Sequence, residues 1–245
     1  MFRPCILVPT FDNPATVRKV VLDVRRHVED VVVVDDGSSE AGRAAVEAIG
    51  RDALARTVRR PKNGGKGAAV KTGFLAARDF GYSHAVQVDA DGQHTLDDLP
   101  RFVETARDNP DALVLGCPVF DASAPKSRLI GRRITQFWSS VETFGRVIAD
   151  PMCGFRVYPL VSAIASGARG NAMDFDPEIA VRMVWAGVRV INLPTRVRYV
   201  SREDGGVSHF RMFEDNALIS WMHTRMVLGA LLRLPLFLFR RRLPQ

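Results

Sequence analysis

Two apolar runs that end in acidic residues constrain the fold more than any other feature of the chain. "VVVVDD" covers residues 31–36, and "HAVQVDAD" covers residues 84–91. The first run has four β-branched residues in succession, which predicts a strand buried on both faces, as in the middle of a parallel sheet. In an open α/β sheet, ligands bind outside the carboxyl ends of the strands. We therefore expect the two acidic clusters to line one crevice.

Strand and helix patterns alternate around these runs. We expect strands at 5–9, within 30–39, at 55–58 and at 85–89, and helices that open at Asn13-Pro14, near 40–49 and from about 65 to 80. The first helix has an apolar face made by valines 17, 20, 21, 24 and 28. Alternation of this kind predicts right-handed βαβ units and an α/β fold.

Composition and cysteine usage set the class of protein. A chain of 245 residues that is 47% hydrophobic and 25% charged can bury one sizeable core. Its cysteines, at positions 5, 117 and 153, have no C-x-x-C spacing, which argues against a zinc site and a disulfide framework. The first apolar strand is reached by Cys5, which leaves no room for a signal peptide. We therefore expect a cytoplasmic protein.

The net charge of +7 is concentrated at the C-terminus. After Asp215 the chain has five arginines and no acidic residue. This pattern favours an anionic membrane surface over nucleic acid. Arg225 and Arg233 interrupt the apolar segment, so it is not expected to span a membrane.

We instead expect an amphipathic helix within about 211–242 that attaches the protein peripherally to the inner face of the cell membrane. Packing of this helix on the domain or on a second subunit is the alternative. Its apolar side would contain Trp221, Met222, Met226, Leu228, Leu231 and Leu232.

The glycine-rich stretch "RPKNGGKGAAVKTGF" lies between the two acidic runs. Asn63 can cap a helix whose first turn carries Lys66, and free backbone N–H groups beside a lysine make an anion site. A Walker loop is excluded, because Arg60 stands where it needs glycine and Gly67 where it needs Ser or Thr. The first strand lacks the glycines of a dinucleotide fingerprint, and the spacing after Asp89 fails that of an EF-hand.

The Asp-x-Asp sequence is the candidate metal site. Asp89, Asp91 and Gln93 offer hard oxygen ligands, which suit Mg²⁺ or Mn²⁺ that also binds two substrate phosphates. A plain turn through aspartate and glycine is the alternative interpretation.

Six motifs in order carry a resemblance to a known family. "VPTFDN", "VVVVDDGSS", "NGGKGAAVKTG", "VDADGQH", "DPMCGFRVYP" and "FDPEIAVRMVWAG" together resemble the family-2 inverting glycosyltransferases of GT-A fold, especially the dolichyl-phosphate mannose synthase-like branch. The resemblance covers 4–210. It implies a GT-A domain over 1–210, with a mostly parallel, Rossmann-like sheet flanked by helices, followed by the amphipathic basic segment 211–245.

The same resemblance implies an activity and a donor site. It implies metal-dependent transfer of a sugar from a nucleotide-sugar donor to a lipid-linked acceptor, either a polyprenyl phosphate or a glycolipid hydroxyl. Lys66 and Gly67 would shape the pocket near Asp89, which with Asp91 and Gln93 would engage metal and diphosphate. The nucleoside would be held by Pro9, Thr10, Asp35 and Asp36.

For the acceptor side, the resemblance places Asp150 at the reaction centre and an acid of the acceptor site at Glu178. Arg156, with Arg132 or Arg133, would hold a phosphate. Asp150-Pro151 read as a plain turn, and Glu178 read as a residue that favours the helix dipole, are the alternatives.

One departure from the family pattern concerns the end of the domain. Relatives that act on polyprenyl phosphate tend to carry Arg-x-Gly-x-Ser-Lys, whereas this chain reads "REDGGVSH", with Ser208 followed by His209 in place of lysine. His209 would ligate the metal or hydrogen-bond a phosphate, or be structural. A sugar nucleotidyltransferase and a catalytically silent lipid-binding module are the alternative functions. The sugar, the base, the acceptor and the oligomeric state stay open.

Overall fold

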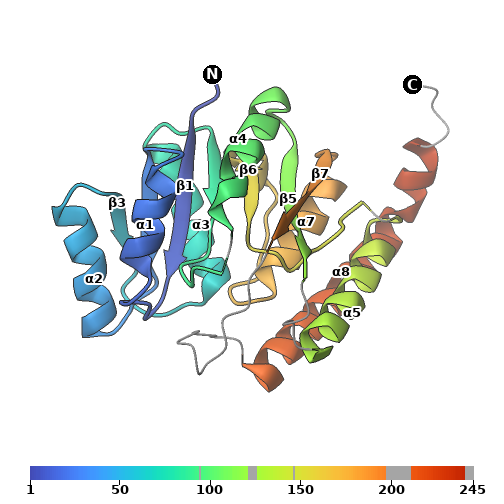
Figure 1. The fold of residues 1–245 in the computed structure, drawn as a ribbon. Helices are drawn as coiled ribbons and strands as arrows, with labels where there is room; N and C mark the ends of the chain where they lie inside the picture. The colour runs from blue at the N-terminus through green and yellow to red at the C-terminus, as the bar shows by residue number, and fades with distance from the viewer. Residues whose placement is uncertain (94, 121–125, 146, 197–210, 241–245) are drawn as a thin grey trace.

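A single seven-stranded sheet organises the molecule (Figure 1). The structure is a computed structural model that describes residues 1–93, 95–120, 126–145, 147–196 and 211–240. The strand order is β3-β2-β1-β4-β6-β5-β7. The strands are β1 (Pro4–Thr10), β2 (Val31–Asp35), β3 (Arg56–Arg59), β4 (His84–Gln87), β5 (Leu113–Val119), β6 (Arg156–Pro159) and β7 (Val190–Arg196).

The strand order reverses beside β1, which is where open α/β sheets commonly bind ligands. The chain runs outward from β1 to β2 and β3, then returns to β4 on the other side of β1, and these four strands pair in parallel. Such a reversal of strand order opens a crevice at the carboxyl ends. In the other half of the sheet, β6 runs antiparallel to β4 and β5, and β5 pairs in parallel with β7. The predicted mostly parallel sheet is confirmed.

Helices cover both faces of the sheet. Buried side chains of α1, α2 and α4 belong to one core cluster, and those of α3, α6, α7 and α8 belong to the other. The helices are α1 (Val17–Arg25), α2 (Glu40–Arg51), α3 (Lys66–Asp79), α4 (Leu99–Asp108), α5 (Lys126–Glu142), α6 (Leu160–Ala165), α7 (Phe175–Trp185) and α8 (Met212–Arg240), with a 3₁₀ turn at Leu96–Asp98.

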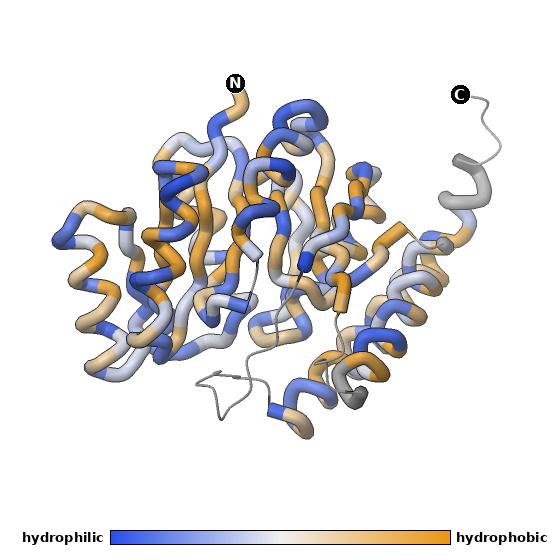
Figure 2. Tube along the Cα trace, viewed as in Figure 1, coloured by the Kyte–Doolittle hydropathy of each residue, from blue (hydrophilic) through white to orange (hydrophobic). Residues whose placement is uncertain are grey.

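The valine run of β2 feeds both core clusters. Val31 and Val33 pack on the α1 side, whereas Val32 and Val34 pack on the α3 side. Successive side chains of a strand point to opposite faces, so a strand covered on both faces needs apolar residues at every position. Figure 2 shows this as hydrophobic colouring within the central strands.

The first helix begins later than predicted. Asn13-Pro14 opens a turn, and α1 starts at Val17, whose backbone N–H donates to the Asn13 carbonyl at 3.1 Å. The apolar face expected of this helix is otherwise present, because Val17, Val20, Val21 and Val24 are buried. Val28 follows the helix and is partly buried.

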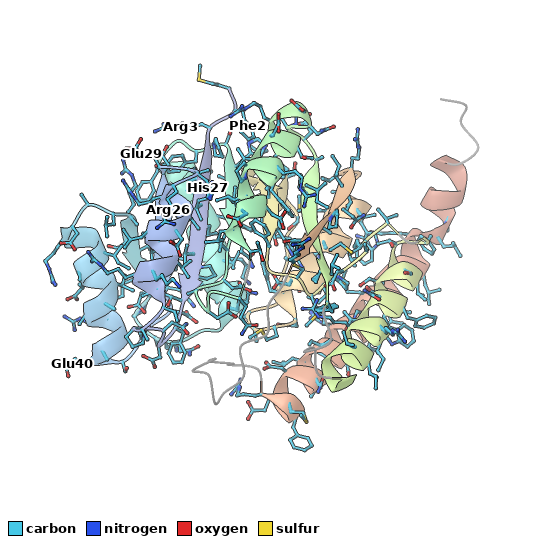
Figure 3. The ribbon with its side chains drawn as sticks, viewed as in Figure 1. Phe2, Arg3, Arg26, His27, Glu29 and Glu40 are labelled. Carbon is cyan, nitrogen blue, oxygen red and sulfur yellow. The ribbon has the colours of Figure 1, made fainter. Side chains whose placement is uncertain are left out.

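The site residues lie at only one of the two ends of the parallel strands. Figure 3 labels Phe2, Arg3, Arg26, His27 and Glu29 around the amino-terminal edge of β1, and Glu40 at the opposite end, where α2 begins just after the acids of β2. The predicted site residues that end β1 and β2 or follow β2 and β4 lie at the carboxyl end of these strands.

The three cysteines are free thiols. Burial raises the pKa of the Cys5 and Cys153 thiols to about 12, and burial also raises the pKa of Cys117. Cys5 and Cys153 are at most 1% exposed, so both act as small apolar core residues.

The C-terminal helix α8 packs on the body of the protein with one of its faces. Ile219, Met222, Met226 and Ala230 are buried, and the first three of these belong to the α3-side core. Met222 and Met226 were expected on a membrane-facing side, so that assignment is wrong for these two residues. Trp221, Leu228, Leu231 and Leu232 are exposed. Across the described part of the chain, no helix is both long and apolar enough to cross a bilayer.

Candidate active site

Asp35 and Asp36, at the carboxyl end of β2, are buried and hold neighbouring backbone N–H groups and arginine side chains. Asp35 accepts the Ser38 backbone N–H at 2.9 Å and pairs with Arg59. Asp36 accepts the Gly65 backbone N–H at 2.7 Å and that of Gly64 at 3.1 Å, and pairs with Arg60. Asp36 therefore fixes the loop that enters α3, whereas Asp35 holds the loop after β2 and the end of β3.

The predicted nucleoside residues Pro9 and Thr10 are also buried. The Thr10 carbonyl accepts the Asp36 backbone N–H at 2.9 Å, so the ends of β1 and β2 are joined. The structure thus brings the four predicted nucleoside residues to one edge. It also adds Arg59, whose side chain is 40% exposed beside them.

Two glycines at the start of α3 allow a close approach to the segment that leads into α7. Gly65 has a φ of +94°, and a Cβ there would lie 2.4 Å from the Asn171 carbonyl oxygen. A Cβ on Gly67 would lie 2.3 Å from the Cβ of Phe175. Larger residues at either position would separate the start of α3 from the start of α7. The glycines thereby place Lys66 against an acid of α7.

Lys66 joins two acids that are far apart in the chain. Its Nζ lies 2.9 Å from Asp89 Oδ1 and 2.9 Å from Asp176 Oδ2. Burial alone would lower the pKa of Lys66, but the charges of Asp176 and Asp89 outweigh burial and raise the pKa above its ordinary value. The side chains of Lys66, Asp89 and Asp176 are 16%, 22% and 4% exposed. One fixed cation therefore bridges two carboxylates that come from different parts of the chain.

Asp89 rests directly on the backbone of Gly154. A Cβ on Gly154 would lie 2.2 Å from Asp89 Oδ2, so no larger residue fits without moving the carboxylate. We expect Gly154→Ala to lower turnover by roughly 10–100-fold while the protein stays folded, because supporting residues around a catalytic group typically have effects of this size. Steady-state kinetics and a thermal midpoint measure the two quantities.

Gly131→Ala is the matched control, since a Cβ at that position meets nothing within 4 Å. Equal turnover of Gly154→Ala and wild type would show that Asp89 is free to shift without loss.

Asp91 follows β4 at the same carboxyl end of the sheet. It is partly exposed, and its Oδ1 accepts the backbone N–H of Gln93 at 3.0 Å. The Asp-x-Asp segment is anchored by the Thr16 hydroxyl, which donates to the Ala90 carbonyl at 2.7 Å. Gln93 is partly exposed as well.

The carboxylate oxygens at this end of the sheet suit a metal ion that also binds substrate phosphates. Among the residues with described placement, no three His, Cys, Asp or Glu side chains form a ready-made cluster. Mg²⁺ and Mn²⁺ commonly use one or two carboxylates, with phosphate oxygens and water completing the shell. Asp89 and Asp91 supply such a pair of carboxylates.

Asp150 is paired with an arginine of α5. Arg132 Nη1 lies 2.6 and 2.7 Å from the two Asp150 carboxylate oxygens, and the Met152 backbone N–H donates to Oδ1 at 2.8 Å. Asp150 is 2% exposed, whereas the Arg132 side chain is 18% exposed. Arg133, the neighbouring candidate, is exposed. Of these two arginines, Arg132 is the one that contacts the predicted reaction centre.

Arg156 does not have the role expected from the sequence. It is 0% exposed and donates to the carbonyls of Pro151, Cys153 and Asp176 at 2.5–2.6 Å. A guanidinium enclosed in this way holds the loop before β6 against α7 and is out of reach of a substrate phosphate. The prediction that Arg156 holds a substrate phosphate is therefore wrong. Arg156 is a structural residue that positions the Asp176 backbone.

Glu178 is also enclosed. Its Oε2 accepts the backbone N–H of Gly170 at 2.6 Å and that of Arg169 at 3.1 Å, and Arg182 Nε donates to Oε1 at 2.7 Å. At 0% exposure it cannot contact an acceptor in this structure. Asp176, two residues earlier, is the acid of this motif that reaches the site, because residues i and i+2 of a helix lie on nearly opposite sides.

The motif "FDPE" contains Asp176, but the sequence predicted a site role for Glu178 and not for Asp176. The available signal was this first acid of the pair, at the second position of α7, where a carboxylate also favours the helix dipole. The remaining candidates, Ser208 and His209, lie outside the described residues.

Comparison with known proteins agrees with the resemblance to family-2 glycosyltransferases. Residues 5–156 match glycosyl transferase family 2. The chain is 26% identical to the undecaprenyl-phosphate mannosyltransferase of Micrococcus luteus over 212 residues, which cover 83% of this chain and 86% of that protein. It is 26% identical to the polyprenol monophosphomannose synthase of Mycolicibacterium smegmatis over 214 residues, covering 83% and 79%.

A solved structure supports the GT-A fold. Glucosyl-3-phosphoglycerate synthase from Mycobacterium tuberculosis, in complex with Mn²⁺ and UDP-glucose, superposes with a TM-score of 0.70 at 15% identity, covering 94% of this chain and 79% of that one. The predicted fold is thus confirmed, and the family match gives no support to a sugar nucleotidyltransferase. The enzyme is a glycosyltransferase, and the chain belongs to glycosyl transferase family 2.

Proposed function

We propose that this enzyme transfers a sugar, with inversion and with a divalent metal, from a nucleotide-sugar donor to a lipid-linked acceptor at the cytoplasmic face of a membrane. The observation that carries the proposal is the juxtaposition of Lys66 with Asp89 and Asp176, together with the partly exposed carboxylate of Asp91 two residues after Asp89. Opposite charges held at one sheet edge suit a donor that brings a diphosphate and a metal together. The names of the relatives support polyprenyl phosphates as the acceptor class.

The donor side of the mechanism rests on fixed charge. Asp91, with Asp89, would hold Mg²⁺ or Mn²⁺, and the metal would stabilise negative charge on the departing nucleoside diphosphate. Lys66 stays protonated between its two acids and offers a second positive charge in the same place. The loop fixed by Asp36 keeps the start of α3 in position as the charge develops.

The acceptor side rests on Asp150 and Arg132. A phosphate acceptor already carries an oxyanion, so it needs positioning by Arg132 rather than a base. A hydroxyl acceptor needs a base, and Asp150 is the carboxylate that would take the proton. In either case attack occurs on the face of the anomeric carbon opposite the leaving group, which inverts its configuration.

A donor and acceptor panel tests the proposal. The protein with Mn²⁺ is incubated with uridine, guanosine and other sugar nucleotides, without acceptor and then with undecaprenyl phosphate or a neutral glycolipid. Slow hydrolysis of one donor, and faster consumption with one acceptor, are the expected results. No hydrolysis or transfer with any donor would favour the catalytically silent lipid-binding module.

We expect Asp150→Asn to lower kcat by roughly 100-fold with little change in donor affinity, because a lost general base or acceptor-orienting group acts on the chemical step. Steady-state kinetics with a separate titration of donor binding measure the two effects. Asp111→Asn, an exposed acid outside the site, is the control. An unchanged rate with weakened donor binding would reassign Asp150 to the nucleotide.

A further inference from the structure

Helix α5 carries an exposed apolar stripe. Ile130, Ile134, Phe137 and Val141 are 59%, 54%, 60% and 39% exposed. Their spacing of four, three and four residues places them on one side of the helix. The opposite side is turned to the protein, since Thr135 and Ser139 are buried.

Helix α8 carries a second exposed stripe. Leu218, Trp221, Leu228 and Leu232 are 39%, 61%, 59% and 81% exposed, and Arg225 occupies the same row between Trp221 and Leu228. The other face of α8 is the one buried in the core. Exposed apolar residues in helical rows on two neighbouring helices exceed the scattered exposure expected of a surface that stays in water.

The two helices are fixed to each other. Glu142 of α5 and His223 of α8 are buried, and Glu142 Oε1 lies 2.7 Å from His223 Nδ1. The Trp185 indole N–H of α7 donates to the Glu142 carbonyl at 2.8 Å and also holds the end of α5. Figure 1 shows α5 and α8 side by side along one side of the molecule. The two stripes are thus carried by one rigid helix pair.

We propose that this helix pair is the surface on which the enzyme docks to an anionic lipid bilayer, an inference that rests on the proposed lipid-linked acceptor. Charge identifies the occupant. Arg133 is exposed on α5, Arg225 lies in the exposed row of α8, and no acidic residue follows Asp215, while Arg233 stacks on the Trp185 ring and does not belong to this surface. A second copy would bring another set of arginines against the first, whereas anionic headgroups neutralise them.

The docking surface is directly connected to the acceptor side of the site. Arg132 lies two residues from both Ile130 and Ile134, and so on the opposite side of α5, where it holds Asp150. The helix that contacts lipid therefore also positions the pair assigned to the acceptor. With a helix about 10 Å in diameter, this pair lies close to the level of the lipid headgroups, where a lipid phosphate would be presented.

Vesicle binding with matched surface variants tests the inference. Ile134→Glu/Phe137→Glu alters the α5 stripe, and Trp221→Glu/Leu232→Glu alters the α8 stripe. Val161→Glu is the control, because Val161 is 80% exposed on α6. Binding to vesicles of phosphatidylglycerol and phosphatidylcholine is measured by flotation at low and high salt, without donor or acceptor. We expect each double variant to reduce the partition coefficient by at least about tenfold and the control to leave it unchanged.

Three results would overturn the inference. Wild-type protein that does not float with the anionic vesicles at low salt is one, and equal flotation of the stripe variants is another. The third is a wild-type dimer in light scattering that the stripe variants convert to monomer, without vesicle binding. Donor hydrolysis in solution is measured in parallel, so that its absence counts against the proposed function and loss of flotation alone counts against the docking surface.

Discussion

The Asp91→Asn variant is expected to lose transfer activity by on the order of 10³-fold while it keeps its fold. The carboxylate is partly exposed, and its Oδ1 accepts the Gln93 backbone N–H at 3.0 Å, a hydrogen bond that the amide oxygen of asparagine can also accept, so we expect the loop to keep its conformation. Losing a charged metal ligand removes stabilisation of the leaving diphosphate, an electrostatic contribution of roughly this size.

Kinetics at increasing Mn²⁺ and a calorimetric titration of Mn²⁺ with the nucleotide sugar measure activity and metal affinity separately. Asp97→Asn is the matched control, since Asp97 is an exposed acid in the turn that follows the Asp-x-Asp segment. Near-wild-type turnover at saturating Mn²⁺ would remove Asp91 from the direct ligands of the metal.

The Lys66→Met variant is expected to lose both stability and activity. It leaves Asp89 and Asp176 facing each other without the cation between them, and Asp176 is 4% exposed. Removing one partner from a buried ion pair costs about 3–5 kcal/mol, because the remaining charge stays desolvated. Since Asp89 keeps some contact with solvent, we expect the lower end of that range for the free energy of unfolding, and at least about a hundredfold lower turnover.

The pH dependence of this loss has a definite sign. The pKa of Lys66 is raised in the folded protein, so its contribution to stability is fully present below the ordinary lysine pKa of about 10.4 and is lost only as pH rises through the raised value. The difference in unfolding free energy between wild type and Lys66→Met should therefore be constant from about pH 6 to pH 9.

Urea unfolding at several pH values measures this difference, with Lys62→Met as the control at an exposed lysine four residues earlier. A Lys66→Met protein that is as stable as wild type but inactive would limit Lys66 to a role with substrate.

The edge of the sheet that carries the site was predictable from local sequence. The first four residues of β2, Val31–Val34, are apolar at every position because both faces of the strand are covered, and the acids Asp35 and Asp36 then stand at its carboxyl end. The helix start at Lys66 was equally local, since glycines precede it. The predicted cap was wrong in detail: Gly65 is the N-cap residue, and the Asn63 side chain accepts the Gly65 backbone N–H at 2.9 Å instead of one from the first turn of α3. Secondary structure and strand ends depend on neighbours within a few residues, which the sequence displays directly.

The partners of each charged group were not predictable in this way. Whether Arg156 meets a substrate or three carbonyls depends on how the loop before β6 packs on α7, residues up to 20 positions away. The pairing of Arg132 with Asp150 likewise joins α5 to the loop before β6. An arginine or an aspartate in a motif can serve either catalysis or structure. Which of the two it serves depends on its burial and on the partners that it meets in the folded protein.

The sequence by itself determined the α/β class, the acidic carboxyl ends of β2 and β4 and the family resemblance, because these follow from side-chain periodicity and from motifs in order. Only the tertiary structure decided that Asp176 rather than Glu178 reaches Lys66, and that Met222 and Met226 belong to the core while Trp221 is exposed. Each of these choices is made by rotation about a helix axis, where a shift of one or two residues turns a side chain to another face. The face that is buried depends on elements far away in the chain, so it is fixed only when they pack together.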